Sequence, residues 1–215
     1  MNAIGRLHVL TDETLQQRFT HLEIARLAAE GGADVVQIRE KRAHTTREQV
    51  DLARRAREIL PAGVQLIVND RADVALAAAA DGVHLGRDDL APDVARRILG
   101  AGHIVGGTAN SIEEARRRFA DPLDYLGVGP VYGTVSKQNP APELGLDALA
   151  RIARESPVPI IAIGNITPER VPEVLAAGAH GIAVLSGVAC AADPVRAAAR
   201  YREAIERFAG AERLP

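Results

Sequence analysis

Charged and amide side chains gather at the end of a short apolar run near position 35. Gln37, Arg39 and Lys41 occupy alternate positions, with Ile38 between the first two. Because successive side chains of a strand point to opposite faces, a strand here would place these three on one face. An amide and two cations on one face could hold an anion. The same string could also be a solvated run of charges, which is the more common meaning of such a pattern.

Two carboxylates follow two later apolar runs. Asp70 comes directly after Asn69, and Asp89 lies a few residues after His84. Carboxylates without a matching Cys or His cluster suit a hard cation such as Mg²⁺, which prefers oxygen and usually keeps waters and substrate phosphate oxygens. A bound cation would also relieve the repulsion between the two aspartates. Each aspartate taken alone could equally be a helix N-cap, and His84 is more often a hydrogen-bonded structural residue than a ligand.

The longest predicted loop, residues 129–140, carries the hydroxyl groups of Thr134 and Ser136 and the cation of Lys137. Its glycines permit close approach of the backbone, so it could hold a second anion. Taken alone, the segment could also be an ordinary surface loop with a solvated lysine.

Short β-branched runs alternate with longer amphipathic segments along the whole chain. The predicted strands are Arg6–Leu10, Asp34–Arg39, Gln65–Asn69, Gly82–Leu85, His103–Gly107, Tyr125–Val128, Ile160–Ile163 and Ile182–Leu185. The predicted helices are Leu15–Ala29, Arg47–Leu60, Asp73–Ala79, Pro92–Leu99, Ile112–Phe119, Leu146–Arg154, Pro168–Ala176 and Pro194–Phe208.

This alternation predicts an α/β protein, a single (β/α)8 TIM barrel over residues 1–215. Near-continuous apolar runs such as Ile160–Ile163 are typical of strands covered on both faces. A doubly wound open sheet is the alternative, but it more often has about five or six strands. In a barrel the carboxyl ends of all strands meet at one rim, so the polar residues above would lie together there. Gly164 and Ser186, after the last two strands, fall where such barrels bind phosphate with backbone N–H groups and a helix N-terminus.

The amino-acid composition limits the kinds of ligand and partner that the protein can bind. With 26 Lys and Arg against 28 Asp and Glu, and aromatic residues at only 3%, the chain offers neither a basic arm nor stacking platforms for nucleic acid. The lone Cys190 excludes an internal disulfide framework and indicates a reducing compartment. No signal peptide or membrane span is predicted, so we expect a cytoplasmic protein acting on small molecules. The Ala-rich outer helices leave a homo-oligomer open.

Several strings, taken in order, resemble the thiamine-phosphate synthase family over essentially the whole chain. They are Gln37-Ile38-Arg39-Glu40-Lys41, Asn69-Asp70, Gly82-Val83-His84-Leu85-Gly86 with Asp89, Gly127-Val128-Gly129-Pro130-Val131-Tyr132, and Ala162-Ile163-Gly164. The resemblance implies a (β/α)8 barrel that joins hydroxymethylpyrimidine diphosphate to a thiazole phosphate, with release of diphosphate. It also implies a dissociative reaction in which the departing diphosphate is stabilised by Mg²⁺ and by cations.

The same resemblance implies a role for each matching residue. The residues expected to bind the pyrimidine diphosphate are Gln37, Arg39, Lys41, Asn69 and Lys137; those for the thiazole phosphate are Thr134, Ser136, Gly164, Leu185 and Ser186; those for Mg²⁺ are Asp70 and Asp89. Thr108 is also expected to bind substrate through its hydroxyl. Arg39, Lys41 and Lys137 would be the catalytic cations. The chain departs from the family's usual residues at three positions, with Thr108 for Ser, Ser136 for Thr, and Asn165 for a second glycine.

Three other functions are compatible with parts of this pattern. The thiazole tautomerase branch of the superfamily resembles the C-terminal part, but it tends to have His where this chain has Asn110, and it tends to lose the Mg²⁺ carboxylates. A noncatalytic thiamine-phosphate-binding protein would bind the product without turnover. A sugar-phosphate epimerase or isomerase would need an acid/base pair rather than a cation-lined pocket.

Overall fold

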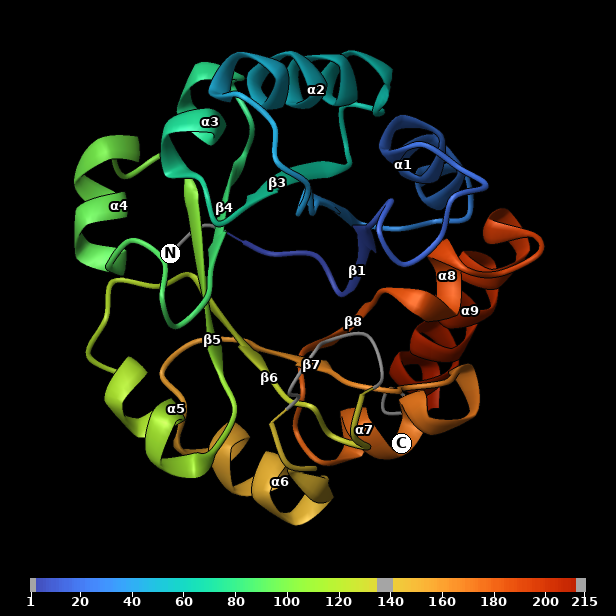
Figure 1. The fold of residues 1–215 in the computed structure, drawn as a ribbon. Helices are drawn as coiled ribbons and strands as arrows, with labels where there is room; N and C mark the ends of the chain where they lie inside the picture. Colours follow the sequence, from blue (N-terminus) through green and yellow to red (C-terminus); the bar gives the residue numbers. More distant parts are fainter. Residues whose placement is uncertain (1–2, 135–140, 212–215) are drawn as a thin grey trace.

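A ring of parallel strands forms the centre of the molecule (Figure 1). The computed structural model describes residues 3–134 and 141–211. Within these residues the eight strands close into a barrel in chain order, and the last pairs with the first. They are β1 (Leu7–Thr11), β2 (Val35–Ile38), β3 (Gln65–Asn69), β4 (Gly82–Leu85), β5 (Ile104–Ala109), β6 (Tyr125–Val128), β7 (Ile160–Ile163) and β8 (Gly181–Val184). The predicted barrel is therefore confirmed, whereas the single domain over 1–215 stays a prediction.

Helices surround the strands on the outside, as Figure 1 shows. They are α1 (His21–Glu30), α2 (Thr46–Ile59), α3 (Ala72–Ala77), α4 (Pro92–Leu99), α5 (Ile112–Arg118), α6 (Gly145–Glu155), the 3-10 turn η1 (Pro168–Arg170), α7 (Val171–Ala176), α8 (Ser186–Ala189) and α9 (Pro194–Ala211). This arrangement follows from the parallel strands, because each connection must cross back over the outside of the barrel. Among the described residues, no helix is long and apolar enough to cross a membrane.

The first helix begins later than its apolar spacing predicts. The pattern predicts a helix from Leu15, but α1 starts at His21, after a capping box between Thr20 and Glu23. The carboxylate of Asp12 accepts hydrogen bonds from the backbone N–H groups of Thr14 and Leu15, at 2.7 and 2.9 Å. These bonds hold the chain in a loop, in competition with a helix. This loop brings Asp12 to the rim of the barrel.

Two layers of apolar side chains make up the core. The larger layer lies between the strands and the helices and includes Val36, Leu66 and Val83. The smaller layer fills the inside of the barrel. Its buried members are Ile4, Leu10, Val35, Ile67, Ile104, Tyr125, Ile161 and Ala183. The polar groups at the carboxyl-terminal rim are therefore held on a rigid, close-packed base.

Candidate active site

Two cavities lie at the carboxyl ends of the strands. The larger cavity, of about 580 Å³, extends mainly along the ends of β2 to β6. The smaller cavity, of about 290 Å³, lies beside the ends of β7 and β8. Both are lined by Leu10, Arg39, Thr134, Ile163, Gly164 and Ala183. Because they share these walls, ligands in the two cavities would be neighbours.

The barrel brings together the site residues predicted within the described segments. The larger cavity is lined by Gln37, Arg39, Lys41, Asn69, Asp70, Asp89, Thr108 and Thr134. The smaller cavity is lined by Arg39, Thr134, Gly164, Leu185 and Ser186. Ser136 and Lys137 lie outside the described residues.

Asp70 and Asp89 form a pair of neighbouring carboxylates at the ends of β3 and β4. Asp89 Oδ2 accepts a hydrogen bond of 2.7 Å from the backbone N–H of Gly86. Asp70 Oδ2 is paired with Lys41 Nζ. Burial raises the pKa of Asp89, and a hydrogen bond with Asp70 and the negative charge of Asp70 raise it further. Two carboxylates in mutual repulsion are a fitting place for a divalent cation.

The donor set fits Mg²⁺ held jointly by protein and substrate. The described residues contain no group of three or more His, Cys, Asp or Glu side chains that could hold a metal. Mg²⁺ commonly takes one or two carboxylates from the protein and completes its shell with waters and substrate phosphates. Asp70 and Asp89 meet this requirement, so their chemistry matches the predicted role.

The amide side chains of Gln37 and Asn69 each keep one buried polar atom without a partner. Within the described part of the chain, Gln37 Oε1 and Asn69 Nδ2 make no hydrogen bond. Such atoms are rare in folded proteins and usually have a specific reason. Both residues line the larger cavity. A polar ligand in this cavity would satisfy them.

Two residues at the cavities have a left-handed backbone although they are not glycine. Asp70 has φ 66° and Asn165 has φ 49°. Asp and Asn tolerate this conformation better than most residues, and such strain is common at functional sites. Asn165 therefore maintains the turn after Gly164 in a conformation that a second glycine would adopt easily. The carbonyl of Asn165 also accepts a 2.9 Å hydrogen bond from Arg170 Nη1.

A short helix follows β8, where the sequence predicts a phosphate-binding helix N-terminus. It is α8, which has only four residues, Ser186–Ala189. A helix this short has a small dipole, because the macrodipole grows from the alignment of successive peptide units. Any anion in the smaller cavity must therefore be bound mainly by local N–H and hydroxyl groups.

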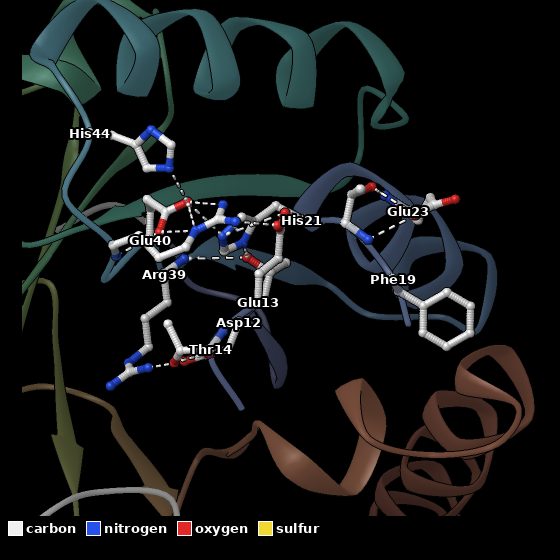
Figure 2. A network of polar contacts seen from close by, with 12 residues as sticks. Asp12, Glu13, Thr14, Phe19, His21, Glu23, Arg39, Glu40 and His44 are labelled. Atoms are coloured by element: carbon white, nitrogen blue, oxygen red, sulfur yellow. Dashed lines mark hydrogen bonds and ion pairs between the residues drawn. The ribbon is translucent and has the colours of Figure 1, made fainter. Parts of the chain in front are cut away.

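Arg39 is held by an aspartate that the sequence pattern did not reveal. Asp12 is only 1% exposed, and its Oδ2 is paired with Arg39 Nη1. Its Oδ1 accepts hydrogen bonds from the backbone and hydroxyl of Thr14 and from the backbone of Leu15. Figure 2 shows the Arg39 side chain reaching away from Glu40 toward Asp12 and Thr14. Asp12 follows the end of the first strand, and this position at the rim is the signal that could have found it.

A second polar cluster fixes the segment that carries Arg39 and Lys41 (Figure 2). His21 is 1% exposed. Its Nδ1 lies 2.5 Å from Thr11 Oγ1, and its Nε2 lies 3.1 Å from Glu40 Oε2. Arg42 pairs with Glu40 and with Glu13. Glu40 thereby attaches the end of β2 to the start of α1.

We expect Glu40→Gln to destabilise the protein at neutral pH. Burial of Glu40 raises its pKa, but hydrogen bonds from the Arg42 side chain and backbone, and the nearby positive charge, lower it to about 2 from 4.5. A lowered folded-state pKa gives stability that is present above pH 4.5 and lost as the pH falls toward 2. The variant should lose about 1–2 kcal/mol of unfolding free energy at pH 7, because solvent screens part of the interaction with Arg42. Urea denaturation at several pH values would measure this.

The control is Glu30→Gln, since Glu30 makes an exposed pair with Arg26 on α1. It should change stability by less than about 0.5 kcal/mol. If Glu40→Gln and the unmodified protein lost stability in parallel between pH 5 and pH 3, the assigned role of Glu40 would be wrong.

A closed barrel of eight parallel strands with a polar cavity at its carboxyl-terminal rim defines a class of protein, the (β/α)8-barrel proteins, whose active sites lie at that rim. A family model described as thiamine monophosphate synthase matches residues 7–188. The chain belongs to the thiamine monophosphate synthase family. By family it is therefore a thiamine-phosphate synthase, and enzymes of this kind are transferases. The resemblance seen in the sequence is confirmed.

Similar proteins agree with this assignment. A thiamine-phosphate synthase of Salinibacter ruber (strain DSM 13855 / M31) is 48% identical over 204 residues, covering 95% of this chain and 90% of the relative. One of Methanocella arvoryzae (strain DSM 22066 / NBRC 105507 / MRE50) is 46% identical and covers 93% of each chain. Among solved structures, the thiamine phosphate pyrophosphorylase from Pyrococcus furiosus matches with a TM-score of 0.85 and 37% identity, covering 94% of this chain and 96% of that one.

Proposed function

We propose that this protein joins hydroxymethylpyrimidine diphosphate to a thiazole phosphate, giving thiamine phosphate and diphosphate. The observation that supports this most is the pair of adjoining cavities with Arg39 in the shared wall. One cavity has paired carboxylates and cations, and the other has a glycine turn and hydroxyl groups. A reaction between two phosphorylated substrates needs two such neighbouring sites.

In this proposal the larger cavity takes the pyrimidine diphosphate. Arg39, Lys41 and Lys137 would contact the diphosphate, and Gln37, Asn69 and Thr108 would contact the substrate's remaining polar atoms. Asp70 and Asp89 would hold Mg²⁺, which would supply positive charge at the diphosphate oxygens. The existing pairs, Arg39 with Asp12 and Lys41 with Asp70, hold both cations at the cavity wall.

The chemistry consists of one bond breaking and one bond forming. The bond between the pyrimidine methylene carbon and the diphosphate oxygen breaks, and both electrons leave with the oxygen. The thiazole nitrogen then gives its lone pair to that carbon. Negative charge grows on the departing diphosphate, so Arg39, Lys41 and Lys137 stabilise the transition state more than the ground state.

The smaller cavity would hold the phosphate of the thiazole. Gly164, Leu185 and Ser186 line it, with Thr134 in the wall shared by both cavities, and Ser136 would join them from outside the described residues. Binding at this remote phosphate would orient the thiazole nitrogen toward the reacting carbon.

We also propose a cytoplasmic location, because the single Cys190 fits a reducing compartment. That the protein forms a homo-oligomer stays a prediction.

The test is to mix the purified protein with both substrates and Mg²⁺ and to measure thiamine phosphate and diphosphate. We expect equal amounts of the two products, and no product when either substrate is omitted. Binding of thiamine phosphate without turnover would instead indicate the noncatalytic binding protein. Conversion of the thiazole phosphate alone would indicate the tautomerase.

A further inference from the structure

We propose that Tyr125 and His84 act as positioning residues that make the Thr108 hydroxyl a hydrogen-bond donor to the ligand in the larger cavity. The inference rests on the proposed function, in which the pyrimidine diphosphate occupies that cavity. It adds which partner donates in the contact between Thr108 and the ligand, and it names the two residues that impose this direction.

The three side chains form a continuous hydrogen-bonded chain across neighbouring strands. The Tyr125 hydroxyl on β6 lies 2.9 Å from His84 Nδ1 on β4, and His84 Nε2 lies 2.8 Å from Thr108 Oγ1 on β5. The rings of His84 and Tyr125 are stacked, with centroids 5.6 Å apart. All three residues line the larger cavity.

Gly106 and Gly127 have no side chains, and this leaves space for the rings of Tyr125 and His84. A Cβ atom at Gly106 would lie 2.2 Å from Tyr125 Cζ, and one at Gly127 would lie 3.0 Å from His84 Cε1. Any larger residue at position 106 would displace the tyrosine ring, because a contact this short is not sterically allowed. The barrel interior is therefore built to accommodate the Tyr125 and His84 rings in this arrangement.

Tyr125 sets the donor and acceptor roles along this series of hydrogen bonds. This residue is only 1% exposed, and burial raises the pKa of its phenol, so the hydroxyl keeps its proton. A buried O–H needs an acceptor. Within the described residues, the hydrogen-bond partner of the Tyr125 hydroxyl is His84 Nδ1. That nitrogen can accept only when it carries no proton.

The positions of the protons on His84 and Thr108 follow from the proton on the Tyr125 hydroxyl. With Nδ1 unprotonated, the imidazole of His84 is neutral and its proton is on Nε2. Nε2 then donates to Thr108 Oγ1. A hydroxyl that accepts one hydrogen bond keeps its own hydrogen available to donate. Thr108 therefore presents a donor to the larger cavity, and the matching ligand atom is an acceptor, such as a pyrimidine ring nitrogen or a phosphate oxygen.

The first test measures the tautomer of His84 directly. Imidazole ¹⁵N chemical shifts of the full-length, ligand-free protein, assigned with a His84→Gln sample, should show a protonated Nε2 and an unprotonated Nδ1. Tyr125→Phe should give a mixture of tautomers, because the donor to Nδ1 is lost. A proton on Nδ1 in the unmodified protein would overturn the proposal. Because this readout needs no substrate and no turnover, it can fail even if the proposed function is correct.

The second test measures the contact with the ligand. Thr108→Val keeps the side-chain shape without the hydroxyl, and we expect the KM for the pyrimidine diphosphate to rise about tenfold, as for one lost hydrogen bond. The KM for the thiazole phosphate should stay the same, and Thr108→Ser should restore the affinity lost in Thr108→Val. An unchanged KM for the pyrimidine diphosphate in Thr108→Val would contradict a donor contact, whatever the tautomer of His84.

Discussion

Replacing Asp70 with asparagine is expected to lower kcat/KM by about 100- to 1,000-fold. The change removes one of the two carboxylates at the ends of β3 and β4 and leaves Lys41 without its partner. One ionic interaction at about 4 Å is worth about 4 kcal/mol at an effective dielectric constant of 20, and each 1.4 kcal/mol changes a rate about tenfold. Turnover measured over a range of Mg²⁺ concentrations would show the loss, with a higher concentration needed for half-maximal rate.

Asp89→Asn should behave similarly, and the double variant should be little worse than either single one, because the two carboxylates act as a unit. The matched control is Asp93→Asn in the first turn of α4, an exposed residue that pairs with Arg97. It should keep its rate within about twofold. Wild-type turnover and Mg²⁺ dependence in Asp70→Asn would show that the metal is held elsewhere.

Replacing Arg39 with glutamine is expected to lower kcat/KM about 100-fold and to raise the KM for both substrates. Arg39 lines both cavities, so its charge acts on the diphosphate and on the neighbouring phosphate. The Arg39 side chain is 14% exposed, so solvent screens its charge only partly. Steady-state kinetics with each substrate varied in turn would separate the two effects.

Asp12→Asn provides a graded comparison. It keeps the charge of Arg39 but weakens the contact that orients the guanidinium, so we expect a smaller loss, about tenfold in kcat/KM. Arg26→Gln on α1, which removes an exposed pair with Glu30, is the control and should have no effect on turnover. If Arg39→Gln raised the KM for one substrate alone, Arg39 would belong to a single site.

Much of the candidate site could be predicted from the sequence because the relevant patterns are local. The alternation of Gln37, Arg39 and Lys41 places them on one face, and all three line the larger cavity. The strand runs 65–69, 82–85, 125–128 and 160–163 were predicted with the bounds that the structure shows. Once the barrel was inferred, the carboxyl end of each strand had to lie at one rim, which brought Asp70 and Asp89 together.

The contacts that sequence reasoning missed join residues far apart in the chain. Asp12 anchors Arg39 across 27 positions, and His84 meets Tyr125 across 41. The segment before α1 has a helical spacing, but the side chain of Asp12 competes for its backbone N–H groups. No local pattern records which distant group will satisfy a buried donor or acceptor.

The sequence by itself determined the class of fold and the chemical types at the rim, because strand and helix periodicity depend on neighbours along the chain. The tertiary structure decided which cation is held by which carboxylate, the division of the rim into two adjoining cavities, and the hydrogen-bonded contacts that link Tyr125, His84 and Thr108. These depend on distances between side chains of different strands, which are fixed only when the barrel closes and its interior packs.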